Sequence, residues 1–518
     1  MKFRVLSIIL VLSILFTSLC ACAVNSGTAE AVSVASDSAI GELADNAQYY
    51  GTVFGQGEVT DINVEISEED WQDILDNAED EEYHSANITV NGTTAENVGF
   101  RTKGLSSLNS VAKSDSDRFG FKIKLDEYVD GQTLDGLDTL VLNGSFSDPS
   151  YMREYLTYAA SAYLECDTPY ISYCNLYING ELFGFYLCIE SYDDSFVERY
   201  TDSEDTVLYK AVSTNCTLLT SDDGSGFDVE YGEDDDYTNI KNLVSVLNST
   251  TADNKDELEA ILDIDSVLKA IAVNTVMGNY DSYSGSIAHN YFLLYSDGKF
   301  TYLGWDYNMS IGGFSADNGG SVYVDVSSPV YGTELSQRPL IEKLLAIDKY
   351  YEQYVSYVES LTDYLYDFET TVNGIADEIR NYVENDPSAF YTIDKFEENI
   401  TESDADLTQV SDSEFGGMGG GKGMPNFDGT QHIGGSEAIP EFADGYFQDR
   451  TPPSGMPDFD EEMTSQGSPN GQTAQNGDFG NKGGMQHQMG GGSINSSAVS
   501  IVDYITQRLE NIQSQLNA

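Results

Sequence analysis

Apolar residues recur with two different spacings along the chain, and each spacing predicts a different kind of element. Alternation of apolar and polar residues predicts strands within residues 87–146, 170–190 and 289–306. Helical spacing predicts helices in SEEDWQDIL, in YMREYLTYAASAYL and in IEKLLAIDKYYEQYVSYVESLTDYLYDF. Because strands and helices are mixed and no internal repeat is recognisable, the folded region is predicted to be α+β.

The last of these strand stretches has the pattern of a single β-hairpin. Residues 289–295 and 299–305 are rich in Tyr, Phe and Leu, as half-buried strands are. Between them stands Asp297-Gly298, a dipeptide typical of a two-residue type I′ turn, in which both central residues take positive φ. The turn therefore predicts both the hairpin and its register.

Polar side chains gather at the open end of this hairpin. The predicted register puts His289 opposite Asp306 and Asn290 opposite Trp305, and Asp281 comes shortly before them. One small volume would then collect three oxygen-bearing side chains and one imidazole. The alternative is a hairpin with merely solvated polar ends, which we disfavour because Asp306 follows an apolar strand and precedes a Gly-rich bend.

Composition and charge limit the classes of function. The chain has 518 residues, of which 40% are hydrophobic and 12% aromatic, enough for a large core. It carries 87 acidic and 24 basic residues, a formal net charge of −63. Nucleic acid and anionic membrane surfaces would be repelled by the body of such a protein. The four cysteines beyond residue 22 match no metal-binding spacing, and their oxidation state is open.

Basic residues, scarce elsewhere, are concentrated in residues 101–124, where six of them oppose two acidic residues. Strand alternation in RFGFKIKLDEY places Arg118, Lys122 and Lys124 on one face and the apolar residues on the other. Arg101 and Lys103 share a face in the same way. Such a row can hold a polyphosphate, or it can offset the protein's own acidic field. Carboxylates at the hairpin favour the first interpretation, because cations and metal-binding carboxylates together make a nucleoside-triphosphate site.

The N-terminus has the pattern of an export signal. Lys2 and Arg4 precede an apolar run over residues 5–19, which has the length of a signal-peptide core. The run ends in LCAC, which resembles the lipobox of bacterial lipoproteins, in which the Cys becomes lipidated. We therefore expect a signal peptide over residues 1–21, lipidated Cys22 and a flexible tether over residues 22–50. The expected location is the outer face of the cytoplasmic membrane, with the lipid as the only membrane contact.

The chain changes character near its C-terminal end. A Gly/Met/Pro-rich stretch, predicted to be disordered, covers residues 411–494 and separates the main folded region (51–410) from the end of the chain. Residues 495–518 return to helical spacing behind a run of serines. This helix is expected to dock on the folded region, because its apolar stripe needs a partner surface in water.

Several motifs in order resemble the spore-coat protein H (CotH) kinase family over roughly residues 60–380. They are GFRTKGLSS, RFGFKIKLDEY, LVLNGSFSDPSYMREYL, CNLYINGELFGFYLCIESYDDSFVERY, VLYK, NYDSYSGSIAHNYFLLY and FTYLGWDYNMSIGG. The resemblance implies a two-lobed atypical protein-kinase fold with a mixed-sheet N-lobe and a helical C-terminal part. It also implies transfer of the ATP γ-phosphate to Ser or Thr of protein substrates, with Mg²⁺ or Mn²⁺.

The resemblance also implies roles for the hairpin residues. Asp281 matches the family Asp ahead of the His-Asn motif, and its implied role is catalytic, as the base or orienter of the substrate hydroxyl. Asn290 and Asp306 match the Asn of that motif and the Asp of the Trp-Asp motif, and both are implied to hold Mg²⁺. His289 belongs to the same motif. The hairpin would thus bring two distant oxygen ligands together, as in ordinary kinases.

Further positions are implied to bind the nucleotide. The stretch FGFYLCIESYDD is similar to a kinase hinge, so the backbone near Glu190 is a candidate for the adenine contact. Lys122 and Lys124 compete for the lysine that pairs with the phosphates, with Glu154 as its helix partner. The sequence leaves that choice open. The implied nucleotide-binding set is Arg101, Lys103, Arg118, Lys122, Lys124, Glu190 and Lys210.

Two positions depart from the family pattern. Many relatives carry Trp-Asp-x-Asp, whereas this chain has Asn308 in WDYN and so lacks one possible carboxylate. Arg118 stands where a lysine is common, which keeps a cation but changes its geometry. A lipoprotein outside the cell also meets little ATP. The alternative function is therefore a surface binding protein or adhesin, or a pseudokinase, that uses the same fold without catalysis.

Overall fold

The computed structural model describes residues 49–55, 59–314, 320–403, 405, 407 and 498–518. The expected signal peptide, the lipidation site Cys22 and the Gly/Met/Pro-rich segment lie outside the described residues. So does nearly all of the expected tether. No helix among the residues described is both long enough and apolar enough to cross a membrane. Strands and helices are mixed throughout, so the α+β prediction is confirmed.

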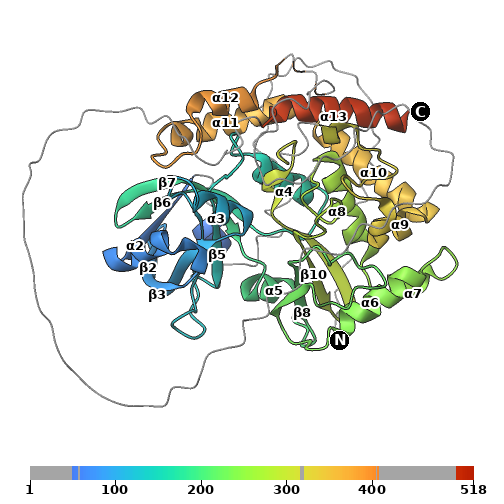
Figure 1. Ribbon diagram of the computed structural model, residues 1–518, viewed down its shortest axis with the longest axis horizontal. Coiled ribbons are helices and arrows are strands. Elements are labelled where there is room, and N and C mark those ends of the chain that lie inside the picture. The colour runs from blue at the N-terminus through green and yellow to red at the C-terminus, as the bar shows by residue number, and fades with distance from the viewer. Residues whose placement is uncertain (1–48, 56–58, 315–319, 404, 406, 408–497) are drawn as a thin grey trace, which may run out of the picture. The chain divides into compact units, whose positions relative to one another are not determined.

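The first sheet closes on itself as a barrel with the strand order β1-β2-β3-β4-β5-β7-β6 (Figure 1). Neighbouring strands are antiparallel, except that β1 and β6 run parallel and close the barrel. Closure leaves no exposed sheet edge. The strands are β1 (Thr60–Ile66), β2 (His84–Val90), β3 (Thr93–Lys103), β4 (Gly120–Lys124), β5 (Thr139–Asn143), β6 (Ile171–Ile178) and β7 (Glu181–Glu190). Its connections contain the α-helices α2 (Glu68–Asp76), α3 (Ser106–Val111) and α4 (Arg153–Tyr163), the last of which lies between β5 and β6.

The barrel interior is built from the alternation seen in the sequence. Phe121 and Ile123 of β4 are fully buried, whereas Lys122 and Lys124, which alternate with them, are partly exposed. Phe121 stacks on Phe100 of β3 with ring centroids 5.0 Å apart. The predicted faces of this strand are therefore confirmed for its apolar residues and its lysines.

The predicted hairpin is confirmed, including its register. It consists of β10 (Tyr291–Ser296) and β11 (Lys299–Gly304), which belong to a second sheet with the order β11-β10-β8-β9. Ser296 faces Lys299 across the turn, where Asp297 and Gly298 have φ of 51° and 80°. The other strands of this sheet are β8 (Val207–Ala211) and β9 (Phe227–Tyr231).

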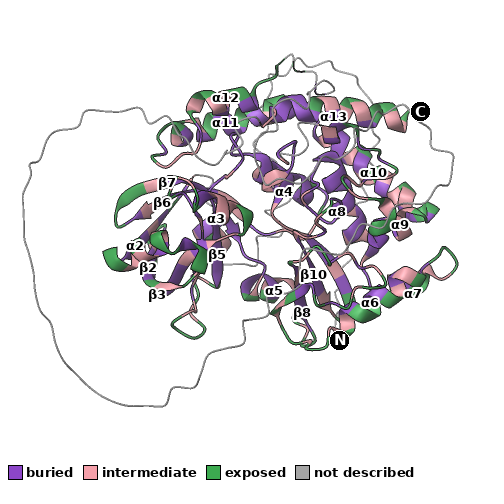
Figure 2. Ribbon diagram, in the orientation of Figure 1, coloured by how far each residue is buried: buried purple, intermediate pink, exposed green. Residues whose placement is uncertain are grey.

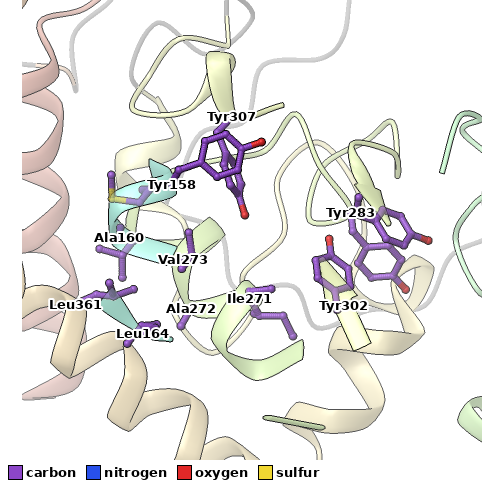
Figure 3. Close-up of a cluster of buried hydrophobic side chains, with 14 of the residues drawn as sticks. Tyr158, Ala160, Leu164, Ile271, Ala272, Val273, Tyr283, Tyr302, Tyr307 and Leu361 are labelled. Atoms are coloured by element: carbon purple, nitrogen blue, oxygen red, sulfur yellow. The ribbon is translucent and has the colours of Figure 1, made fainter. Parts of the chain in front are cut away.

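Helices supply most of the remaining core. The large buried cluster draws on α4, α8 and α10 together with β11, as the close-up of its side chains shows (Figure 3). In Figure 2 the core-facing sides of these helices are buried, whereas α7 is largely exposed. The helices are α4 (Arg153–Tyr163), α5 (Asp194–Tyr200), α6 (Thr238–Ser249), α7 (Lys255–Glu259), α8 (Ile264–Val276), α9 (Pro339–Leu345), α10 (Asp348–Tyr364), α11 (Phe368–Glu384), α12 (Ile393–Ile400) and α13 (Ile501–Leu516).

Of the three helices predicted within the main folded region, two form as predicted and the third is divided into two. The side chain of Ser67 caps α2 by accepting a hydrogen bond from the backbone N–H of Asp70, and α4 occupies YMREYLTYAASAYL. The long stretch starting at Ile341 forms α9 and α10 instead of one helix. Ile347 between them takes an extended conformation and is buried, so its apolar side chain enters the core at the break.

The four described cysteines are free, and Cys174, Cys188 and Cys216 are buried. They are small apolar residues of the core here. The C-terminal helix α13, red in Figure 1, belongs to the same compact unit as the barrel and the other helices. It contacts α8, α11 and α12 and the short 3₁₀ helix η5 (Gly320–Tyr323).

Candidate active site

The open end of the hairpin brings Asp281, Asn290 and Asp306 close together. The Asn290 side-chain amide donates to the backbone oxygen of Asp281 at 2.8 Å and to its Oδ2 at 3.3 Å. The backbone N–H of Trp305, next to Asp306, donates to the Asn290 carbonyl at 3.2 Å. Asn290 and Asp306 both have positive φ, 58° and 56°. The chain therefore leaves the regular strand on both sides and turns these side chains toward one place.

Asp306 is the electrostatic centre of this group. Burial and, to a smaller extent, the neighbouring Asp306 carboxylate raise the pKa of Asp281 to about 7, whereas the hydrogen bond from Asn290 opposes the shift. Burial lowers the pKa of His289, and Asp306 acts in the opposite direction. Near neutral pH the Asp281 carboxyl can therefore both accept and release a proton.

A third carboxyl group, that of Glu154 on α4, faces Asp306 from the other side. It is buried, and the Asn143 side-chain amide at the end of β5 donates to its Oε2 at 2.5 Å. Burial, followed by the Asp306 charge, raises the pKa of Glu154 to about 8, while Lys103 and Asn143 oppose the shift. Like charges this close are unfavourable, so a cation at this place would be stabilised.

Lys103, at the end of β3, is the lysine whose charge acts on Glu154. It faces Gly120 of β4, and the Lys103 Cε lies 3.4 Å from where a Cβ on Gly120 would stand. The missing side chain leaves room for the lysine to lie across β4. Among the described residues Lys103 makes no ion pair within 4.0 Å, yet its charge acts on Glu154. Neither Lys122 nor Lys124, the two candidates for the partner of Glu154, is among the main charges that act on it.

Lys122 and Lys210 lie together in a second charged group. The pKa of Lys122 is lowered by burial, and the neighbouring Asp193 and Glu230 act against this. Lys210 of β8 approaches Glu230 of β9 at 3.4 Å. Both lysines, one from the barrel and one from the second sheet, therefore lie near the carboxylate of Glu230.

Three predicted cations are held by protein partners. Arg118 is buried, and its guanidinium donates to Asp386 Oδ2 at 2.6 Å and to the Gly144 carbonyl at 2.8 Å. The prediction that Arg118 contacts nucleotide is therefore corrected, because it ties the barrel to the segment after α11. Arg101 pairs with Glu81, and Lys124 lies 3.6 Å from Glu127. Neither acts on the carboxyl groups around Asp306.

Glu190 is also occupied within the barrel. Its carboxylate accepts hydrogen bonds from Tyr49 Oη at 2.6 Å and from Arg199 Nη2 at 2.7 Å. Its backbone N–H donates to the Tyr170 carbonyl at 2.9 Å. The Glu190 N–H is therefore occupied within the protein, and an adenine contact by the backbone near Glu190 stays a prediction for its neighbours.

Two polar residues near the site were not predicted. Asn143 orients Glu154, and its signal in the sequence was an Asn-Gly pair that ends an apolar strand. Asp193 follows the hinge-like strand β7, and burial together with Asp138 raises its pKa well above the usual range. Its signal was an acidic pair directly after an apolar run.

The donor set suits a cation that is shared with a ligand. Among the described residues no group of three or more His, Cys, Asp or Glu is gathered to hold a metal ion alone. Mg²⁺ in nucleotide sites needs one or two protein oxygens and takes its other ligands from phosphate and water. The carboxylate of Asp306 and the amide oxygen of Asn290 fit this need, because Asn290 uses its nitrogen toward Asp281.

The chain is similar in sequence to known proteins. Residues 100–412 match the model of the CotH kinase protein family, which includes every hairpin residue discussed above. The chain is also similar to the inner spore coat protein H of Bacillus subtilis (strain 168), with 25% identity over 192 residues. That alignment covers 35% of this chain and 52% of the relative, so it spans about half the length of the curated protein.

Proposed function

The chain belongs to the CotH kinase protein family, and from this premise we propose that it transfers the γ-phosphate of ATP to Ser or Thr of protein substrates. The observation that carries the proposal is the convergence of Asp281, Asn290 and Asp306 at the open end of one hairpin. Glu154 and Lys103 face Asp306 from the barrel side. These residues come from β3, α4 and the hairpin, far apart in the sequence.

Each side chain has a role that its surroundings support. Asp281 orients the substrate hydroxyl and accepts its proton, and a pKa of about 7 suits a general base at neutral pH. Lys103 attracts the phosphates, and Glu154 positions the Lys103 ammonium group. Asp306 and Asn290 would hold Mg²⁺ or Mn²⁺, which when bound neutralises the phosphate charge. The raised pKa values of Glu154 and Asp281 are those of a site without that positive charge.

The same residues support a kinase-like architecture as part of the proposal. In protein kinases a strand lysine pairs with a helix glutamate, and a hairpin separates the catalytic-loop Asn from the metal-binding Asp. Here Lys103 on a strand and Glu154 on a helix correspond to the first pair, since the lysine charge acts on the carboxyl group although the two form no ion pair within 4.0 Å. Asn290 and Asp306 correspond to the second. The barrel would act as the N-lobe, and the second sheet with helices α6–α13 would act as the C-lobe.

The name of the relative also bears on location. A protein called an inner spore coat protein suggests that this chain too acts at a coat or cell surface. The LCAC motif at residues 19–22 supports export with lipidation at Cys22. We propose an exported kinase at the cell envelope, with the lipid as its membrane contact and with protein substrates presented there.

One observation favours a second candidate function, a surface binding protein without catalysis. Asn308 replaces the second carboxylate of the Trp-Asp-x-Asp pattern, and it lies in the 3₁₀ turn η4 (Tyr307–Met309) directly after Asp306. An amide there contributes less negative charge to a metal site. A protein that binds partners through this fold would keep the hairpin but need no nucleotide.

A phosphotransfer assay on the protein without its signal peptide, residues 23–518, tests the proposal. With labelled ATP, Mg²⁺ or Mn²⁺ and Ser/Thr-containing acceptors, we expect label on protein, and none with Asp281→Asn. Asp253→Asn, an exposed carboxylate on another surface, is the matched control and should keep full transfer. Absence of transfer and of metal-dependent ATP binding in the unmodified protein would instead support the binding-protein alternative.

A further inference from the structure

The C-terminal helix α13 is part of the core although it lies outside the family match. The match ends at residue 412, whereas α13 begins at Ile501. Ile501, Tyr504 and Ile505 are nonetheless fully buried, and so is the guanidinium-bearing side chain of Arg508. A helix that is added from outside the matched region therefore completes the interior of the protein.

Helix α13 binds the segment that follows Asp306. Arg508 Nη1 donates to the backbone oxygens of Val322 at 2.8 Å and Val324 at 2.7 Å. The hydroxyls of Tyr504 and Ser321 are 2.7 Å apart. Gln515 Oε1 accepts a hydrogen bond from the Val326 N–H at 2.7 Å. Backbone groups along residues 321–326 are thus fixed by one face of α13.

The contacts also reach residues much closer to Asp306. Arg153, which precedes Glu154 on α4, donates from Nη2 to the Val499 carbonyl at 2.7 Å and from Nε to the Ile311 carbonyl at 3.3 Å. A Cβ on Gly312 would stand 2.5 Å from Val499 Cγ2. The start of α13, the loop after Asp306 and the helix that carries Glu154 are therefore packed directly on one another.

The hydrogen bonds of Arg508 indicate that this side chain positions other segments of the chain. Its Nε donates to the Thr275 carbonyl of α8 at 3.0 Å, and its three bonded acceptors are all backbone oxygens. Among the described residues its Nη2 has no hydrogen-bond partner. A buried cation costs desolvation free energy, and an apolar residue of similar size often stabilises as well or better. Unlike an apolar residue, the arginine can donate directed hydrogen bonds to three backbone carbonyls.

We propose that α13 is a tethered clamp that positions the segment after Asp306, with Arg508 and Arg153 as positioning residues, and that its docking switches the proposed kinase on. This inference rests on the proposed function. Release of α13 would loosen residues 307–314 and 320–326, and Asp306, the proposed metal ligand, would lose its place. A displacement of about 1 Å in an active site can cost about 100-fold in rate.

The tether makes docking an intramolecular event. About 90 residues separate Leu407 from Ala498, and both ends of this stretch are anchored on the same unit. The Leu407 N–H donates to Gln507 Oε1 at 3.2 Å, and Ser403 Oγ donates to Asp503 Oδ2 at 2.6 Å. Cutting the chain between these anchors would remove the high effective concentration of α13 without removing any described contact.

The first experiment uses the variant Arg508→Met, with Arg380→Met on α11 as the matched control. Arg380 is a partly exposed arginine whose partners are Asp377 and Glu397. Arg508→Met should lower kcat about 10- to 100-fold and also raise the KM for ATP, because displacement of Asp306 disturbs both the transfer step and the metal-dependent hold on the nucleotide. Arg508→Lys should restore only part of the rate. Arg380→Met should behave as the unmodified protein.

Hydrogen exchange separates this inference from the proposed function, because it needs no catalysis. In Arg508→Met, amides of residues 307–314 and 320–326 should exchange faster while those of β3–β5 stay protected. Unchanged exchange in those residues would overturn the clamp even if the protein is a kinase. Faster exchange in a protein that transfers no phosphate would support the clamp and refute the kinase proposal.

The second experiment cuts the full-length chain at a specific protease site introduced near residue 450. The cut protein should remain active at high concentration and lose activity on dilution, whereas the uncut protein should show no dilution effect. Activity that persists after chromatography has removed the α13 fragment would overturn the proposal. Loss of activity that returns when the fragment is added back would support it.

Discussion

The barrel interior and the open end of the hairpin obey opposite physical rules. Inside the barrel, Phe100, Phe121 and Ile123 are fully buried, apolar and regular in backbone conformation. At the hairpin end, Asn290 and Asp306 have positive φ, and three carboxyl groups act on one another. Locally unfavourable conformations and charges persist where a ligand or a reaction gives them a use. The contrast agrees with the proposal that the barrel stabilises the fold and the hairpin end carries the chemistry.

The largest expected effect comes from removing the central charge. Asp306→Asn should reduce phosphate transfer about 1,000-fold or more, because the site loses its principal metal ligand. The protein should remain folded, since replacing the charge relieves repulsion from Glu154 and Asp281. Transfer assays and thermal unfolding in the absence of metal check both parts. A large loss of folding stability would show that Asp306 is structural instead.

A substitution in the barrel should have the opposite effect, a loss of stability with little change in rate. Phe121→Ala should lower the free energy of unfolding by about 3–5 kcal/mol, because a fully buried ring stacked on Phe100 leaves a cavity. Denaturant unfolding measures the change. At temperatures where this variant is folded, its kcat should stay within about threefold of the unmodified protein. A selective loss of kcat would break the separation between the two regions.

Two lysines of the same sheet sharpen the comparison. Lys103→Ala should weaken Mg²⁺·ATP binding or transfer about 10- to 100-fold, because the lysine charge acts on Glu154, which in turn interacts with Asp306. Lys124→Ala should change either quantity less than about twofold, because this lysine pairs with Glu127 instead. Titration calorimetry and transfer assays compare them directly. Equal effects would refute the assignment of Lys103.

The smallest effect is a change in how stability depends on pH. The pKa of Glu154 is raised to about 8 in the folded protein from an ordinary value of 4.5, so folding favours the protonated form. Its contribution is therefore fully present below pH 4.5 and is lost as the pH rises toward 8. Without metal, Glu154→Gln should raise Tm by at least about 2 °C at pH 8 and change it little at pH 5.

The sequence predicted those parts of the site that depend on local rules. The turn at Asp297-Gly298 determined the register of β10 and β11, and with it the approach of Asn290 to Trp305 and Asp306. Alternation correctly separated the lysines of β4 from its apolar residues. Both results follow from short-range geometry, which a single sequence contains.

The parts that could not be predicted depend on contacts between distant segments. Alternation placed Arg118 with the exposed lysines, but Asp386, which is 268 residues away in the chain, buries and pairs it. Lys103, rather than Lys122 or Lys124, is the lysine whose charge acts on Glu154, and its side chain passes over Gly120 of β4. Strand periodicity tells which face a lysine occupies, but not which end of the strand meets the helix.

Binding of Mg²⁺·ATP by calorimetry tests the central claim most directly, because it separates the residue that holds the metal from the residue that accepts the proton. Asp306→Ala should lose most of the metal-dependent affinity, whereas Asp281→Ala should keep it within about threefold while losing transfer. Equal loss of ATP affinity in both variants, or no measurable binding by the unmodified protein, would contradict the account.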